Sequence, residues 1–158
     1  MAISWPERLP LPTVEGYTVR PQEAILRTEM EAGPARQRRR FTTTPSRIAV
    51  RWILSCSQFA LFEAWYHWHA QEGGAWFEIS LLGGLGLTLH EARFTCQWEA
   101  RLKGGQLWEV VSELEIRERP TLAKDLLKIA LKEDINSLQQ TIEAFHTLVH
   151  YQLPSQLP

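Results

Sequence analysis

The densest group of side chains able to do chemistry is a run of arginines. Arg36, Arg38, Arg39 and Arg40 fall within five positions. Guanidinium groups bind phosphates and carboxylates through paired hydrogen bonds. On a strand, Arg36, Arg38 and Arg40 would share one face and Arg39 would lie on the other. Such a row could contact the phosphates of a nucleic acid, the carboxylates of a neighbouring subunit, solvent, or the inner wall of a ring.

The charge balance of the chain bears on these uses. Seventeen Lys and Arg residues are matched by eighteen Asp and Glu residues, which gives a formal net charge of −1. Proteins dedicated to duplex binding carry a basic excess, because their affinity comes largely from the release of counterions. A subunit contact or a solvated strand is therefore favoured. The alternative is a nucleic-acid-binding module led by Arg36–Arg40.

Other residues with catalytic or ligand-binding chemistry lack the required spacing. His146 and His150 are four residues apart, but no third metal ligand lies nearby in the sequence. The glycines of residues 83–87 lack the third glycine and the following helix of a dinucleotide-binding turn. No serine lies in a nucleophile-elbow motif. We therefore expect no enzymatic activity, no cofactor and no metal.

Length and composition indicate a folded protein with one main domain. The chain has 158 residues, of which 44% are hydrophobic, enough for a core. No apolar run approaches the roughly 18 residues that a membrane-spanning helix needs. The first residues lack the charged and apolar parts of a signal peptide. Cys56 and Cys96 are expected to be buried free thiols in a protein made in a reducing cytoplasm.

Hydrophobic periodicity predicts an α+β protein in four parts. We expect an extended N-terminal arm rich in proline, a mainly antiparallel β-sandwich-like domain with one crossing helix, a C-terminal helical hairpin and a flexible tail. The arm would lie along its own domain or reach a neighbour. The ranges are residues 1–22, 23–119, 120–151 and 152–158.

Within the β-rich part, two strands are clearest. In residues 47–54, Ile48, Val50, Trp52 and Leu54 face one way and Arg47, Ala49, Arg51 and Ile53 face the other. Residues 106–119 give the longest strand pattern. Between them, residues 57–71 have helical spacing, with Ser55 or Ser57 as N-cap and Gly73-Gly74 as the stop. Thr121 is the expected N-cap of the next helix. Further strands are expected at residues 23–30, 36–41, 76–82, 87–94 and 95–102.

The seven tryptophans divide into two groups by their register. Trp52, Trp65, Trp76 and Trp108 lie on apolar faces and are expected in the core. The others lie off these faces or in the arm, and large aromatic side chains commonly anchor protein interfaces. We therefore predict contacts with another subunit for Trp5, Trp68 and Trp98.

Several segments follow one another in a recognisable order, although each is a weak motif by itself. They are EAGPARQRRRF at 31–41, PSRIAVRW at 45–52, QFALFEAWYHW at 58–68, GAWFEISLLGGLG at 74–86, HEARF at 90–94 and LWEVVSELEIRERP at 107–120. Over about residues 15–120 this order resembles minor tail proteins of long-tailed bacteriophages and prophages, of the distal-tail or tail-tip type. The arm and the C-terminal helices fall outside the resemblance.

The resemblance implies a structural protein of the virion tail. It implies a β-sandwich-like domain related to tail-tube proteins, without enzymatic activity. It also implies a homo-oligomeric ring, a trimer or hexamer, that contacts the tail tube protein and the hub or tip proteins near the baseplate. DNA could pass the lumen of such a ring without specific binding, and no membrane is involved. The predicted C-terminal hairpin departs from the pattern and could dock a hub, cap the ring or bind a fibre.

Overall fold

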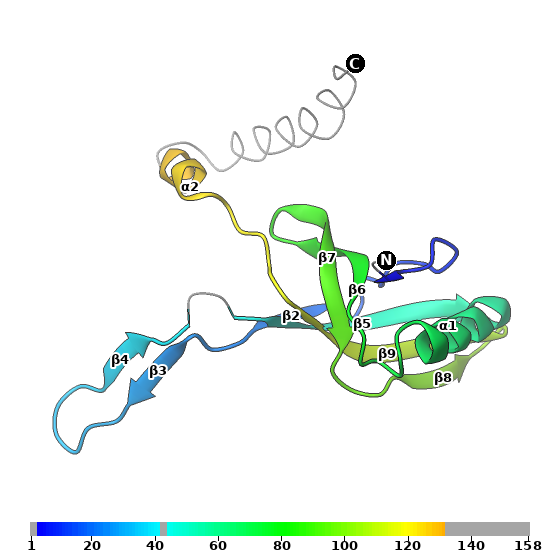
Figure 1. The fold of residues 1–158 in the computed structure, drawn as a ribbon, viewed down its shortest axis with the longest axis horizontal. Helices are drawn as coiled ribbons and strands as arrows, with labels where there is room; N and C mark the ends of the chain where they lie inside the picture. Colours follow the sequence, from blue (N-terminus) through cyan, green and yellow to red (C-terminus); the bar gives the residue numbers. More distant parts are fainter. Residues whose placement is uncertain (1–2, 42–43, 132–158) are drawn as a thin grey trace. The chain divides into compact units, whose positions relative to one another are not determined.

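The computed structural model describes residues 3–41 and 44–131 (Figure 1). The protein is mixed α/β, made mostly of strands in sheets with two helices, and this fits the sandwich-like α+β class expected from the sequence. The chain forms two compact units, residues 1–83 with 87–119 and residues 84–86 with 120–158. The helix predicted near residues 134–150 and the predicted tail lie outside the described residues.

Seven strands form the main sheet. The spatial order is β1-β6-β7-β9-β5-β2, and β8 also pairs with β9. β1 runs parallel to β6, whereas β2 is antiparallel to β5, and β5, β7 and β8 are each antiparallel to β9. The bounds are β1 Ile3–Ser4, β2 Thr18–Pro21, β5 Ser46–Ser55, β6 Phe77–Gly83, β7 Gly86–Phe94, β8 Glu99–Lys103 and β9 Leu107–Ile116.

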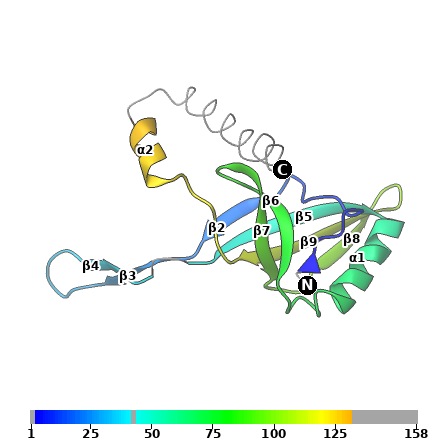
Figure 2. The same cartoon turned by 45° about the horizontal axis from the view of Figure 1, so that its top comes forward.

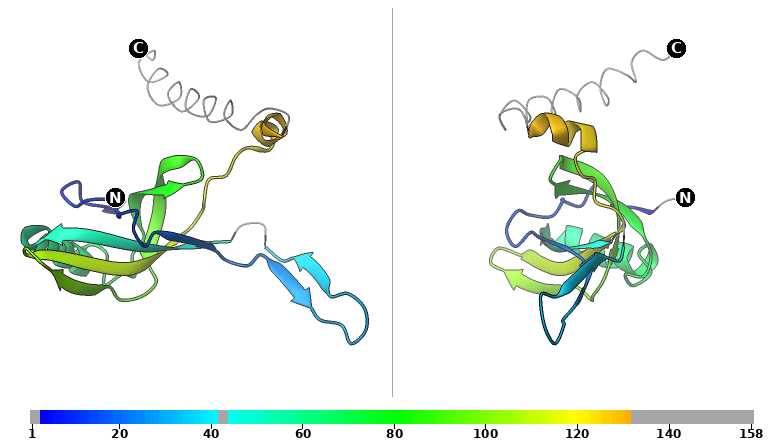
Figure 3. Two further views of the ribbon diagram at one scale, coloured as in Figure 1. Left: turned by 180° about the vertical axis from the view of Figure 1, so that it is seen from behind. Right: turned by 90° about the vertical axis from the view of Figure 1, so that its left-hand side faces the viewer.

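The long strands β5 and β9 are the centre of this sheet, and they lie side by side in Figure 3. Ile48 pairs with Leu114 and Trp52 pairs with Val110, so the apolar positions of both strands share one face. Burial alternates along β5 as the sequence predicts, with Ile48, Val50, Trp52 and Leu54 buried. One face of the sheet therefore builds the core.

Helix α1, Cys56–Trp68, supplies side chains to the same core. Its N-cap is Ser55, which is one of the two candidates predicted from the sequence. The Ser55 hydroxyl accepts a hydrogen bond from the Gln58 backbone N–H, and the Gln58 side-chain oxygen accepts one from the Ser55 backbone N–H. Phe62, Trp65 and Tyr66 are its buried residues. After the helix, Gly73 has φ +89°, and a Cβ there would lie 2.8 Å from the Tyr66 hydroxyl oxygen.

The N-terminal segment lies along its own domain, the first of the two alternatives expected for the arm, and it pairs with two strands of the main sheet (Figures 1 and 2). The Trp5 N–H donates to the Glu78 carbonyl of β6 at 2.8 Å, and the Thr13 N–H donates to the Arg51 carbonyl of β5 at 2.7 Å. Leu9 and Trp5 are both buried. Proline keeps this stretch extended as predicted, but its apolar side chains pack into the domain itself.

Trp5 is the main anchor of this segment, so its predicted role as a subunit contact is wrong. The side chain is only 8% exposed. Its ring stacks on Trp52 with centroids 5.2 Å apart and meets Trp65 edge-on at 5.0 Å. The indole N–H donates to the Pro10 carbonyl at 3.3 Å. The ring and its one polar atom are thus both used inside the subunit.

Two element boundaries differ from the sequence expectation. Thr95 still bonds to the Glu113 carbonyl, but the chain then bends, and β8 begins at Glu99 rather than near residue 95. Helix α2, Lys124–Ala130, begins after Ala123 and not after Thr121, and it has no side-chain cap. Asp125 in its first turn supplies a negative charge where the helix dipole favours one.

The remaining strands, β3 Ile25–Thr28 and β4 Arg36–Arg39, form a separate two-stranded antiparallel sheet. We call this element the β3–β4 hairpin. Neither of its strands has a buried residue.

Replacing Trp5 with alanine should destabilise the isolated subunit by about 3–5 kcal/mol, the usual cost of removing a buried tryptophan. Urea denaturation followed by far-UV circular dichroism measures this change. The matched control is Trp68→Ala, because Trp68 is 76% exposed and its loss should change the unfolding free energy by no more than about 0.5 kcal/mol. Equal effects of the two substitutions would contradict the core role of Trp5.

Candidate functional site

The β3–β4 hairpin carries the arginine run, and its register decides which side chains share a face. Directly opposed residues of antiparallel strands lie on the same face. Arg38 is opposite Leu26 and Arg36 is opposite Thr28, whereas Arg39 is opposite Ile25. The predicted alternation of Arg36 and Arg38 against Arg39 is therefore confirmed. Arg40 follows the end of β4, and its guanidinium carbon lies 5.2 Å from the centre of the Phe41 ring.

The arginines of the hairpin differ in their partners. Arg27 pairs with Glu29 at 2.7 Å, and the Arg39 Nε donates to the Phe41 carbonyl at 2.9 Å. Within residues 3–41 and 44–131, no carboxylate pairs with Arg36 or Arg38. These two side chains line a surface hollow together with Leu26, Thr28 and Met30. This surface, which we call the Arg36/Arg38 face, presents two guanidiniums beside a few apolar groups.

The polar face of the main sheet differs, because its charges are paired within the chain. Glu113 contacts Arg20 at 3.4 Å and Arg47 at 3.5 Å. Similar contacts cover Glu109 and Glu115, which are mostly buried although they lie on this face. Their partners are Arg51 and Lys103 for Glu109, at 2.5 and 3.2 Å, and Arg93 for Glu115, at 2.6 Å. The carboxylates of this face are thus already occupied by cations of the same chain.

The other predicted interface tryptophans have different environments. Trp68 lies on α1 and is 76% exposed, so its predicted subunit contact stays a prediction. Trp98 is half-buried against the core, with ring centroids 5.7 Å from both Phe59 and Phe62. Trp98 follows the bend at residues 95–96 and packs on the core of its own subunit, which corrects the expectation that its register places it at an interface.

The four tryptophans expected in the core are not all equally buried. Trp52 and Trp65 are buried, and Trp108 is half-buried and stacks on Phe59 at 4.6 Å. Trp76 precedes β6 and is also only half-buried. The guanidiniums of Arg93 and Arg117 lie 4.7 and 4.6 Å from its ring, so cation–π contacts take the place of core packing there.

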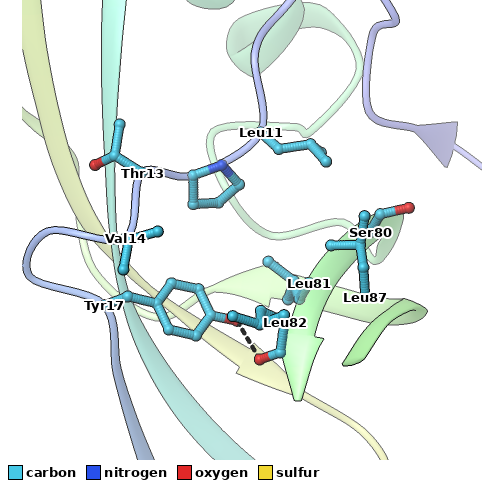
Figure 4. A pocket seen from close by; sticks show the side chains of 9 residues that line it. Leu11, Thr13, Val14, Tyr17, Ser80, Leu81, Leu82 and Leu87 are labelled. Atoms are coloured by element: carbon cyan, nitrogen blue, oxygen red, sulfur yellow. Dashed lines mark hydrogen bonds between the residues drawn. The ribbon is translucent and has the colours of Figure 1, made fainter. Parts of the chain in front are cut away.

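An apolar pocket of about 130 Å³ lies between the N-terminal segment and β6 (Figure 4). Across it, the Tyr17 hydroxyl donates to the Leu82 carbonyl at 2.9 Å, the hydrogen bond that Figure 4 draws as a dashed line. Burial raises the pKa of Tyr17 above its usual value of 10.0. No pattern in the sequence predicts this pocket, because its walls come from separate segments. The lining residues are Leu11, Pro12, Thr13, Val14, Tyr17, Ser80, Leu81, Leu82 and Leu87.

The cysteines and candidate metal ligands do not form a site in the described part of the chain. Cys56 and Cys96 are free, as expected, but both are exposed rather than buried. Cys56 begins α1 at the end of β5, and Cys96 lies in the bend before β8. Residues 3–41 and 44–131 contain no group of three or more His, Cys, Asp or Glu residues placed to hold a metal. His146 and His150 lie outside these residues.

No helix within the described ranges has the length and apolar character needed to cross a membrane. Comparisons with known proteins found no matching family model, no matching curated protein and no matching solved structure.

The raised pKa of Tyr17 predicts a specific pH dependence of stability. The phenol ionises more readily in the unfolded chain, so the folded state loses stability as the pH rises above about 10. Burial also raises the pKa of Tyr66. Tyr17→Phe removes the Tyr17 contribution to this pH dependence and leaves the Tyr66 contribution in place. Urea unfolding at about pH 8 and about pH 10.5 should show a larger loss for the wild type than for the variant. An equal loss in both proteins would contradict this assignment.

Proposed function

We propose that this chain is a structural, non-enzymatic subunit of the tail tip of a long-tailed phage. In this proposal it forms a trimeric or hexameric ring that joins the tail tube to the hub or baseplate, and its location is the virion. The ordered segments between residues 31 and 120 support the kind of assembly, through their resemblance to minor tail proteins. The sandwich-like α+β fold is compatible with a domain related to tail-tube proteins.

The observation that carries the assembly part of the proposal is the β3–β4 hairpin. A two-stranded sheet is marginally stable in water without a third strand or a packing layer. This one buries none of its strand residues in the subunit, and neither outer edge pairs with another strand in the described part of the chain. Contact with another chain would supply the missing burial.

A ring also requires two different patches on each subunit, because a rotational contact joins one face to an unlike face of the next copy. The hairpin is one such patch. The exposed indole of Trp68 on α1 offers a second, since tryptophan is among the residues that most often dominate interface energies. We assign the subunit contact to these two surfaces.

The second compact unit offers a surface for a different partner. Helix α2 has no buried residue, and Leu127 and Ile129 are each 47% exposed. Apolar side chains on a short helix without a core are typical of a segment that packs on a partner. In the proposal, α2 and the residues that follow contact the hub or tip protein.

Replacing residues 25–39 with a short glycine–serine turn should abolish the ring and leave the subunit folded. The hairpin contributes no side chain to the core, so thermal unfolding of the subunit should be nearly unchanged. Size-exclusion chromatography with light scattering should give three or six times the 18.3 kDa subunit mass for the wild type and one subunit mass for the variant.

The companion measurement is mass spectrometry of purified particles, which should contain the wild-type chain. A wild-type protein that is monomeric at every concentration and absent from particles would end the tail-tip proposal. Trp68→Ala is the second variant, and it should weaken the oligomer without changing the thermal midpoint of the subunit.

A further inference from the structure

The β3–β4 hairpin is a two-stranded ribbon with a shape and charge that differ from those of the rest of the chain. Its strands contain four arginines and no acidic residue. Residues 23–41 as a whole carry five arginines and three glutamates, a formal charge of +2, which leaves −3 on the rest of the chain. Positive charge is therefore concentrated in an element that buries none of its strand residues.

The arginines are arranged to meet an anion with a repeating charge. Arg36 and Arg38 are two residues apart on β4, so their side chains leave the same face about 6.6–6.8 Å apart along the strand. Arg40 follows directly, and Arg27 and Arg39 lie on the opposite face. Glu29 is occupied by Arg27, so it offsets the surplus only locally.

The polar face of the main sheet in a second copy is a poor match for the Arg36/Arg38 face. The glutamates on the polar face of the main sheet already contact arginine or lysine of their own chain, as Glu109, Glu113 and Glu115 show. Their use by a neighbour would require those ion pairs to break. A polyanion from another kind of molecule meets the Arg36/Arg38 face without breaking any of those ion pairs.

We propose that the β3–β4 hairpin binds duplex DNA, with its Arg36/Arg38 face against the major groove and the two guanidiniums on backbone phosphates. The major groove of B-form DNA is about 12 Å wide and admits a two-stranded β-ribbon. Arginine forms paired hydrogen bonds with phosphate oxygens. Contacts to phosphate position a protein without reading sequence, so the binding is independent of base sequence.

Groove shape separates DNA from RNA in this arrangement. The major groove of A-form RNA is deep and too narrow for side chains to read, although its phosphates carry the same charge. A ribbon that docks in the groove should therefore prefer duplex DNA to duplex RNA. A ribbon that only attracts negative charge should not discriminate between them.

The test is fluorescence anisotropy of a labelled mixed-sequence DNA duplex of about 20 base pairs with the full chain, at about 50–200 mM monovalent salt. Three proteins are compared: the wild type, Arg36→Ala/Arg38→Ala, and the control Arg20→Ala/Arg101→Ala. The control removes the same charge from exposed arginines of the main sheet that pair with Glu113 and Glu99. Thermal midpoints should be the same in all three.

We expect the wild-type affinity to fall steeply with salt, because bound phosphates release counterions. The slope of log K against log salt should decrease by about two units in the hairpin variant, roughly 0.9 for each lost phosphate contact, and remain unchanged in the control. Duplex RNA of the same sequence should bind more weakly. Polyglutamate at equal charge concentration should displace the DNA less well than unlabelled duplex does.

Four results would overturn the inference: no binding at about 50 mM salt, the same slope in the hairpin and control variants, equal affinity for RNA and DNA, or equal competition by polyglutamate. Equal competition by polyglutamate would indicate that the hairpin binds an acidic protein surface instead of DNA. The inference does not rest on the tail-tip proposal. If the protein is a monomer that binds DNA, only the ring proposal is contradicted. If it forms a ring that does not bind DNA, only the proposed contact with the major groove is contradicted.

Discussion

The packing of Trp5 against Trp52 and Trp65 is the contact on which the rest of the structure depends. It holds the N-terminal segment across the core between β1, which pairs with β6, and β2, which pairs with β5; in this stretch the Trp5 and Thr13 N–H groups each donate one backbone hydrogen bond to those strands. Burial of an aromatic side chain removes about 150–250 Å² from water, which contributes roughly 4–6 kcal/mol at 25 cal/mol per Å². Domains of this size are stable by only about 5–15 kcal/mol. One side chain from the N-terminal segment therefore accounts for a large part of the stability.

The apolar core on one face of the sheet determines what the other face can do. Since β5 and β9 alternate, their polar residues gather on the opposite face, where Arg47 and Arg51 meet glutamates of β9. Single exposed ion pairs stabilise a fold by less than about 1 kcal/mol. Here the ion pairs neutralise the glutamates of this face, because each of these carboxylates already contacts an arginine or lysine of its own chain. A charged face and short edge strands also disfavour uncontrolled pairing with other sheets. The hairpin, Trp68 and α2, in contrast, present surfaces that have few partners within the subunit.

The sequence predicted the parts of this structure that depend on local patterns. Alternation identified β5 and β9, and helical spacing identified α1 with Ser55 as one of two candidate N-caps. The role of Trp5 could not be predicted, because Trp52 and Trp65 lie 47 and 60 residues further along the chain. The prediction for Trp98 failed for a different reason: the bend at residues 95–96 and the irregular residues 97–98 interrupt the two-residue period on which register counting depends. Strand alternation in the sequence placed Arg36 and Arg38 on one face and Arg39 on the other. The pairing of Arg36 with Thr28 and of Arg38 with Leu26 depends on the register between β3 and β4, which the pattern of one strand does not determine.

Net charge argued against nucleic acid at the level of the whole chain, and the structure shows why such an average conceals a local surplus. The arginines of the main sheet are matched by glutamates, so they contribute to the balance without being available to a ligand. In the hairpin, Arg27 pairs with Glu29, whereas Arg36 and Arg38 contact no carboxylate in the described part of the chain. The two faces of the ribbon also differ, since Arg36 and Arg38 lie on one side and Ile25 and Arg39 on the other. A ribbon with two unlike faces can contact a protein neighbour on one side and a polyanion on the other. Assembly into a ring and contact with DNA are therefore compatible uses of a single element, and the strand register that separates its faces is what allows both.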